Sequence, residues 1–303
     1  LSAQLRMYSD SESEIGDSRP ATPADEDCCH NACDPCIFDI HRKLLEEYRQ
    51  RKKQNIKEKK EKNVLSQIAY RNFNVVSIAE IVKNYILVTL KEEGTRCKYA
   101  TIHINPGQHV ILHAWGLTRS FTPISWSKKY ITFLVKLYQN GKFSFHLQKT
   151  SIGERISMRG PYGDFHYRRN SFQAVFMFSI GSGIAAHYPI AKAITADDFE
   201  ETRLHLVAGF QKLREVPLRN ELQNLSDYWN FKCTIHISQP SDEIINYHGI
   251  NIKYGRLNEE SVSKILQTSL EQTLILICGT EEFNESLKQW TTNLGYKSIH
   301  IFQ

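Results

Sequence analysis

The chain has 303 residues, a net charge of +5 and a hydrophobic content of 41%. This length exceeds what one core usually serves, so two folded domains are expected. No apolar run reaches the roughly 18 residues that span a bilayer, and nothing beyond a basic stretch at residues 42–62 suggests nucleic-acid binding. The mild positive charge suits either a solvated surface or attraction to an acidic protein partner.

Four of the seven cysteines fall within nine residues: Cys28, Cys29, Cys33 and Cys36. An odd number of cysteines in a chain of this size argues against a disulfide framework. It favours a reducing compartment, so a cytoplasmic or organelle-associated soluble location is expected. The chain begins at Leu1 without an initiator Met, which leaves a preceding anchor or targeting peptide open.

The first 65 residues read as three segments. Residues 1–27 are rich in Ser, Asp, Glu and Pro and predict a disordered tail. Residues 28–50 hold the cysteine cluster and the start of a charged helix, and residues 51–65 read as a charged linker.

The cysteine cluster has three open interpretations. Cys33 and Cys36, two residues apart, can grip one tetrahedral metal, and Cys28 or Cys29 could complete the set. Zinc is preferred over an iron–sulfur cluster because the four cysteines are so closely spaced. The alternatives are a partner-docking or structural element and a segment without a discrete function.

Residues 66–169 predict a small antiparallel barrel. Residues 73–93 are β-branched and alternate, which predicts two strands, and short strands are expected at 109–115, 120–125, 130–138 and 154–160, separated by Gly, Pro and Asn turns. Residues 160–165 read as a turn that closes the barrel. A short helical pattern at 143–148 follows the turn Asn140-Gly141.

Residues 170–303 alternate strands with helices, which predicts a parallel sheet in an α/β domain. The strands are expected at 174–180, 204–210, 231–238, 273–278 and 298–302, and the helices at 185–194, 218–229, 260–270 and 281–295. The predicted fold class is therefore an antiparallel barrel followed by a parallel-sheet α/β domain.

Two stretches of the barrel have the chemistry to bind a flat, phosphorylated cofactor. Arg119 can hold a phosphate, Phe121 can stack on a heterocycle and Thr122 can hydrogen-bond a ring nitrogen. The glycine turn at Gly141 presents backbone N–H groups at a helix start, which is an anion site. An ordinary strand and a plain hairpin turn would give the same residues.

Two stretches of the α/β domain suit a dinucleotide. Gly181-Ser182-Gly183 follows a buried strand and opens a helix, so backbone donors can approach a pyrophosphate. Cys278-Gly279 ends another strand and falls at the same edge of the predicted sheet. A buried structural cysteine is the plainer interpretation of Cys278 alone.

In this order and spacing, the motifs resemble the ferredoxin–NADP reductase superfamily, and above all the NADH–cytochrome b5 reductase family. The resemblance covers residues 65–303. It rests on R-S-F-T-P-I-S, V-K-L-Y, N-G-K-F-S, R-G-P-Y-G-D-F, G-S-G-I-A-A, F-Q-K-L-R-E-V-P-L-R-N-E-L, Y-G-R-L-N-E-E and C-G-T. The residues around the Cys cluster resemble a short oxidoreductase-like motif appended to some reductases.

The resemblance implies that NADH gives hydride to FAD, which passes single electrons to a haem protein such as cytochrome b5 or to another one-electron acceptor. It implies catalytic contacts for Thr122, near flavin N5, and for Cys278, near the nicotinamide ring. The cofactor-binding residues that it implies are Arg119, Phe121, Thr122, Pro123, Lys136, Tyr138, Gly141, Lys142, Phe143, Ser144, Gly181, Ser182, Gly183, Ala185, Gln211, Cys278 and Gly279.

Departures from the family pattern gather in the nicotinamide half. Ile180 replaces a Gly, which crowds the turn, and Ala185-Ala186 replaces Thr-Pro. Thr280 replaces a Pro, and Ser238-Gln239 stands where the family has an acidic residue favouring NADH. An FAD-binding scaffold with an impaired nicotinamide site is therefore the alternative to an active reductase. A metal-binding interaction protein on a degenerate scaffold is the third hypothesis.

Overall fold

The computed structural model describes residues 19–28, 36–54, 63–94, 100–239 and 247–302. By its contacts the chain divides into two units. Residues 1–62 and 67–69 form one unit, and residues 63–66 and 70–303 form the other.

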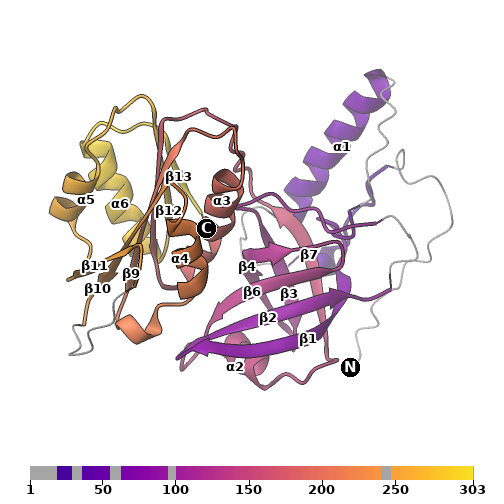
Figure 1. Cartoon of the computed structure of the whole chain (residues 1–303). Helices are drawn as coiled ribbons and strands as arrows, with labels where there is room; N and C mark the ends of the chain where they lie inside the picture. The colour runs from indigo at the N-terminus through magenta and orange to yellow at the C-terminus, as the bar shows by residue number, and fades with distance from the viewer. Residues whose placement is uncertain (1–18, 29–35, 55–62, 95–99, 240–246, 303) are drawn as a thin grey trace. The chain divides into compact units, whose positions relative to one another are not determined.

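The N-terminal unit contains the short 3-10 helix η1 (Asp25–Asp27) and the helix α1 (Ile37–Gln54), drawn in indigo and violet in Figure 1. The helix begins before the charged stretch, and the boundary expected at residue 50 lies inside it. Within this unit His41 Nε2 lies 3.3 Å from the carbonyl oxygen of Pro20. None of the described helices is long and apolar enough to cross a bilayer.

The second unit begins with a seven-stranded antiparallel sheet in the order β4-β3-β7-β1-β2-β6-β5. The helix α2 (Lys142–Lys149) follows β6. The strands are β1 (Arg71–Val82), β2 (Tyr85–Glu92), β3 (His109–Ala114), β4 (Leu117–Phe121), β5 (Pro123–Trp126), β6 (Tyr130–Lys136) and β7 (Arg155–Tyr162).

The two edge strands of this sheet are consecutive in the chain. β4 ends at Phe121 and β5 begins at Pro123, so Thr122 alone links the edges. The sheet must curl until its edges meet, which gives the predicted barrel. Its interior is filled by apolar side chains from every wall, including Phe73, Phe133 and Met158.

The rest of the second unit is a parallel sheet in the order β11-β10-β9-β8-β12-β13. Its strands are β8 (Ala174–Ile180), β9 (Arg203–Phe210), β10 (Phe231–Ile237), β11 (Ile250–Tyr254), β12 (Thr273–Cys278) and β13 (Ile299–Ile301). Its helices are η2 (Gly181–Gly183), α3 (Ile184–Thr195), η3 (Leu213–Glu215), α4 (Arg219–Ser226), α5 (Glu259–Ile265) and α6 (Glu281–Asn293). The predicted fold class is confirmed.

Helices cover both faces of this sheet. In Figure 1, α3 and α4 lie on the face toward the barrel and α5 and α6 on the other. The central strand shows why, because alternate residues of β8 point to opposite faces. Val175 and Met177 pack with α3, whereas Phe176 and Phe178 pack with α5 and α6.

Three local expectations were wrong. β11 was not predicted, because its sequence INIKY is short and mostly exposed. The run expected as one strand at 120–125 is divided by Thr122 between β4 and β5. Residues 160–162, expected in a turn, belong to β7, where Gly160 takes a φ of +145° that suits glycine.

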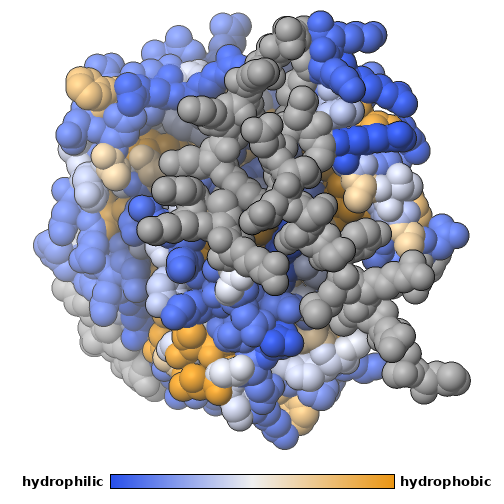
Figure 2. Space-filling view, turned by 90° about the vertical axis from the view of Figure 1, so that its right-hand side faces the viewer, coloured by the Kyte–Doolittle hydropathy of each residue, from blue (hydrophilic) through white to orange (hydrophobic). Residues whose placement is uncertain are grey.

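Figure 2 shows one face of the molecule by hydropathy. The described residues on this face are mostly hydrophilic, and the hydrophobic ones appear as small separate patches. This pattern is expected where apolar side chains are collected in the cores described above.

A histidine lies inside the apolar core. His187 of α3 is 0% exposed and its ring lies 5.7 Å from that of Phe302. Neither ring nitrogen has a hydrogen-bond partner among the described residues. Burial, together with the nearby His300, lowers the pKa of His187 to about 3. The imidazole is therefore neutral in the folded protein.

We expect His187→Met to flatten the acid side of the stability profile. The unfolded His takes up a proton below about pH 6.5 and the folded one does not, so the wild type loses about 1.4 kcal/mol per pH unit from this group as pH falls toward 3. Melting temperatures at pH 7 and pH 5 measure the effect, with the exposed His248→Met as control. An equal fall in both variants would contradict the assignment.

Candidate functional site

A pocket of about 1160 Å³ lies at the carboxyl ends of β8, β9, β10 and β12 and faces the barrel; we call it the main pocket. The chain runs from β8 outward through β9 and β10, then returns to place β12 on the other side of β8. Open α/β sheets bind ligands at such a reversal of strand order. The volume exceeds the roughly 300–1,000 Å³ usual for one small ligand, which leaves room for two.

The barrel wall of the main pocket is built around the seam between β4 and β5. Arg119 has an exposed side chain that lines the pocket and donates from Nη1 to the carbonyl of Thr118 at 2.9 Å. The ring of Phe121 lies 5.5 Å from that of Phe143 and 6.1 Å from that of Phe133. Packing fixes this ring while part of it lines the pocket.

The amino end of α2 also lines the main pocket. Gly141 caps the helix, and its carbonyl accepts from the backbone N–H of Phe145 at 2.9 Å and from the hydroxyl of Ser144 at 3.1 Å. A Cβ on Gly141 would lie 2.5 Å from Ser144 Oγ, so glycine keeps this turn tight. The first N–H groups of α2 have no intrahelical acceptor, and the Lys142 ammonium adds positive charge. These residues fit a pyrophosphate.

The α/β wall is formed where β8 and β12 end side by side. A Cβ on Gly183 would collide with the backbone carbonyl of Cys278. This position therefore requires glycine. The close approach of Gly183 to the Cys278 backbone packs the Gly181–Gly183 turn directly against the end of the sheet. A dinucleotide can then reach the backbone there.

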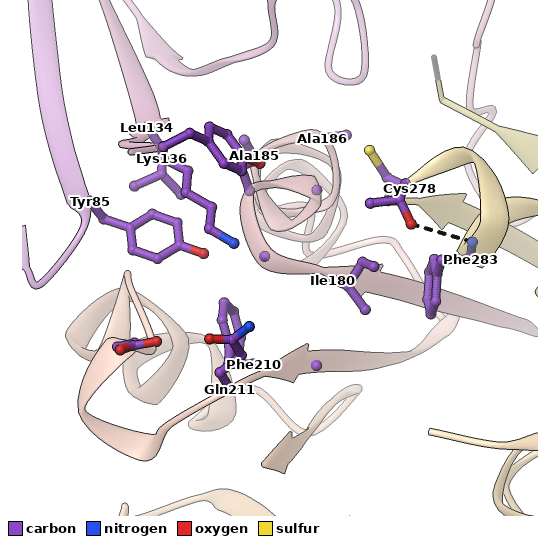
Figure 3. Close-up of a pocket in the computed structure, with 18 of the residues that line it drawn as sticks. Tyr85, Leu134, Lys136, Ile180, Ala185, Ala186, Phe210, Gln211, Cys278 and Phe283 are labelled. Carbon is purple, nitrogen blue, oxygen red and sulfur yellow. Dashed lines mark hydrogen bonds between the residues drawn. The ribbon is translucent and has the colours of Figure 1, made fainter. Parts of the chain in front are cut away.

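Ile180 is accommodated by two glycines on the neighbouring strands. A Cβ on Gly209 of β9 would lie 3.1 Å from Ile180 Cγ2, and one on Gly279 after β12 would lie 2.7 Å from Ile180 Cγ1. The side chain thus occupies space that these glycines leave free. The Ile180 side chain therefore does not crowd the turn as expected, because it extends toward Phe283 (Figure 3).

Cys278 lies in the main pocket as a neutral thiol. Burial raises its pKa to about 12, so the sulfur stays protonated at physiological pH. Two residues later, Thr280 caps α6 by accepting the backbone N–H of Phe283 at 3.4 Å, drawn as a dashed line in Figure 3. The Thr that departs from the family pattern therefore serves as a helix cap.

The main pocket brings together the candidate residues from both halves of the second unit. All of those named from the sequence line it except Pro123, which is buried at the start of β5. Other residues line it that were not predicted from the sequence: Tyr85, Phe210, Glu215, His236, Arg256, Phe283 and Trp290. Phe210, Glu215 and Arg256 stand in motifs quoted above but were not named as site residues. The other four lie outside every motif, and only the fold brings them here.

The cysteine cluster is described only in part. Cys29 and Cys33 lie outside the described residues, and Cys28 and Cys36 are half-buried. Among the residues that the structure describes, no three His, Cys, Asp or Glu side chains form a group that could hold a metal. The zinc site therefore stays a prediction.

Three stretches of the chain match known protein domains. Residues 72–167 match the oxidoreductase FAD-binding domain, residues 177–289 the oxidoreductase NAD-binding domain, and residues 17–57 the N-terminal domain of oxidoreductase-like protein. The domain limits expected from the sequence stay predictions.

Curated relatives match over most of the chain. The NADH-cytochrome b5 reductase-like protein of Mus musculus is 27% identical over 94% of both chains. NADH-cytochrome b5 reductase 1 of Debaryomyces hansenii is 30% identical, over 63% of this chain and 68% of that protein. This chain belongs to the NADH-cytochrome b5 reductase family. As a member of it, the chain is an FAD-dependent NADH oxidoreductase.

Solved structures agree on the fold of this NADH-cytochrome b5 reductase family member. The cytochrome b5 reductase domain of Ulva prolifera nitrate reductase superposes with a TM-score of 0.69 at 19% identity, covering 78% of this chain and 99% of that domain. The barrel and the parallel sheet are thus those of the family.

We expect Arg119→Ala to weaken FAD binding by roughly tenfold or more, because a charge-assisted hydrogen bond contributes about 1.5–3 kcal/mol. Quenching of FAD fluorescence on titration with apoprotein measures the affinity. Arg155→Ala is the matched control, since Arg155 lies in the same barrel but pairs with Glu93 at 2.7 Å, outside the main pocket. Equal affinity in wild type and Arg119→Ala would remove this role.

Proposed function

We propose that this enzyme transfers electrons from NADH through FAD to a one-electron acceptor of the haem-protein type, such as cytochrome b5. The observation that carries the proposal is the main pocket, in which the flavin motif of the barrel faces the glycine turn of the α/β domain. Bound FAD would accept a hydride from the nicotinamide and release its electrons singly. The protein's own part is to bind and orient the two ligands.

In the flavin half, Arg119, Lys142 and the N–H groups at the start of α2 would hold the FAD phosphates. Phe121, fixed by Phe143, would stack on the flavin rings. Thr122 is half-buried at the seam and lines the pocket, where its hydroxyl would hydrogen-bond the flavin near N5.

In the nicotinamide half, the Gly181–Gly183 turn and Gly279 would let the dinucleotide approach the backbone. Gln211, exposed after β9, would offer an amide to it. Cys278 would contact the nicotinamide ring through a neutral thiol, since burial raises its pKa to about 12. A protonated sulfur adds no negative charge beside a ring that becomes cationic on oxidation.

The test is to load the full chain with FAD, record its visible spectrum and add NADH without oxygen. Bleaching of the flavin absorbance, followed by reduction of added cytochrome b5, is the expected result. Flavin that binds but stays oxidised would favour the scaffold alternative. Bleached flavin that does not reduce cytochrome b5 would contradict the proposed acceptor alone.

The residue Ala185 offers a test of the nicotinamide half. It is 6% exposed in the first turn of α3 and lines the main pocket, so it cannot supply the hydroxyl found in the family. We expect Ala185→Thr to raise the rate of flavin reduction by NADH severalfold, since one hydrogen bond contributes about 1 kcal/mol. Stopped-flow absorbance measures the rate. Ala185→Val adds similar bulk without a hydroxyl, and an equal effect of both would refute the explanation.

Nucleotide choice is expected to depend on the end of the main pocket formed by Ser238 and Arg256. A carboxylate there accepts a hydrogen bond from the ribose 2′-hydroxyl of NADH and repels the 2′-phosphate of NADPH. An Arg instead attracts that phosphate. We expect Ser238→Asp to raise the ratio of kcat/KM for NADH over NADPH about tenfold. Ser238→Asn, similar in size but neutral, should leave the ratio unchanged. No difference between Asp and Asn would contradict this placement.

A further inference from the structure

A Tyr and a Lys that are cross-strand partners stand at the end of the barrel nearest the α/β domain. Tyr85 begins β2 and pairs directly with Lys136 at the end of β6. The pairing is held by a hydrogen bond from the backbone N–H of Leu137 to the carbonyl of Asn84, at 2.7 Å. Partners in register point to the same face of a sheet. The Lys136 ammonium lies 5.9 Å from the centre of the Tyr85 ring and 5.2 Å from that of Tyr138.

This pair meets the glycine turn of the α/β domain. A Cβ built on Gly181 would lie 3.3 Å from Lys136 Nζ and 3.4 Å from Tyr85 Oη. Figure 3 shows the hydroxyl and the ammonium pointing into the same part of the pocket from adjacent strands. Gly181 has a φ of +57°, and its lack of a side chain leaves the space in front of both groups open.

Both groups retain hydrogen-bonding capacity. In the part of the chain that the structure describes, no carboxylate lies within 4.0 Å of Lys136 Nζ and no hydrogen bond engages Tyr85 Oη. The Tyr85 side chain is otherwise buried, at 2% exposure. Burial, with Tyr138 and Glu215 nearby, raises its pKa, so the hydroxyl stays a proton donor. A buried donor and a cation without a counter-ion form a site for an anionic oxygen.

We propose that Tyr85 is a second donor of a phosphate subsite that it forms with Lys136, and that this subsite holds a phosphate oxygen of the nicotinamide nucleotide against the Gly181 turn. The inference rests on the proposed function and assigns to it a residue outside every motif. Gly181 belongs to the α/β half, whereas the amino end of α2 is the anion site of the flavin half. The subsite is therefore assigned to the nicotinamide nucleotide.

The same two strands supply a matched control. Tyr130 and Lys91 are also cross-strand partners of β2 and β6, and Lys91 Nζ lies 5.7 Å from the Tyr130 ring. This second pair is at the other end of the strands and does not line the main pocket. Tyr130→Phe removes the same atom from the same kind of pair without touching the proposed subsite.

The experiment measures the affinity of the oxidised, FAD-loaded full chain for NAD⁺ by calorimetry, without turnover. We expect Tyr85→Phe to weaken binding roughly tenfold, which is about 1.4 kcal/mol, because a hydrogen bond to a charged group is lost. We expect Tyr130→Phe to bind like the wild type. With NADH as substrate, Tyr85→Phe should raise KM and leave kcat nearly unchanged, as for a contact made equally in ground and transition states.

A double-mutant cycle tests whether the two donors share one oxygen-bearing group. We expect Tyr85→Phe to weaken NAD⁺ binding much less in a Lys136→Met background than in the wild type, because the phosphate is then no longer held at the subsite. Fully additive losses would overturn the shared subsite.

Wild-type affinity in Tyr85→Phe, with an unchanged melting temperature, would overturn the proposal. Weaker FAD retention with unchanged NAD⁺ affinity would also overturn it, because the donor would then serve the flavin. Flavin that NADH fails to bleach, in a protein whose NAD⁺ affinity depends on Tyr85, would contradict the proposed function but support the subsite.

Discussion

Gly183 lies against the backbone carbonyl of Cys278 with no room for a Cβ. This contact brings the ends of β8 and β12 together at the point where the strand order of the sheet reverses, and the floor of the main pocket is formed there. A side chain at residue 183 would push the helix-opening turn away from the sheet. The neutral thiol of Cys278, the glycine turn and the groups of the barrel that face it would then no longer share one cavity.

The structure accommodates two of the departures from the family pattern that are described above. Ile180 occupies space left by Gly209 and Gly279, and Thr280, which replaces the Pro of the family pattern, caps α6. Two of the substitutions that raised doubt about the nicotinamide half are thus matched by their surroundings. Ala185 is different, because its buried methyl group lines the pocket and cannot itself supply the missing hydroxyl. Loss of one contact is compatible with an active enzyme.

The fold class and nearly all strands could be predicted from the sequence, because hydrophobic periodicity and glycine turns are local signals. Many of the pocket residues that stand in motifs were named, such as Arg119 and Gly183. The strand β11, whose exposed residues carry no period, was not predicted, and neither was Tyr85, which reads as an ordinary strand aromatic. Nothing local distinguishes Tyr85 from Tyr130, since each faces a Lys across the same strand pair. Only the packing of the barrel end against Gly181 separates them.

The single-residue link at Thr122 has a consequence for the stability of the folded barrel. The two edges of the barrel sheet meet where the flavin motif lies, so a bound flavin would contact both sides of the seam. A ligand that binds only the closed form adds RT ln(1 + [L]/Kd) to its stability. Without flavin the barrel would lack this contribution, so separation of its two edges would cost less free energy and would expose the chain there to proteases.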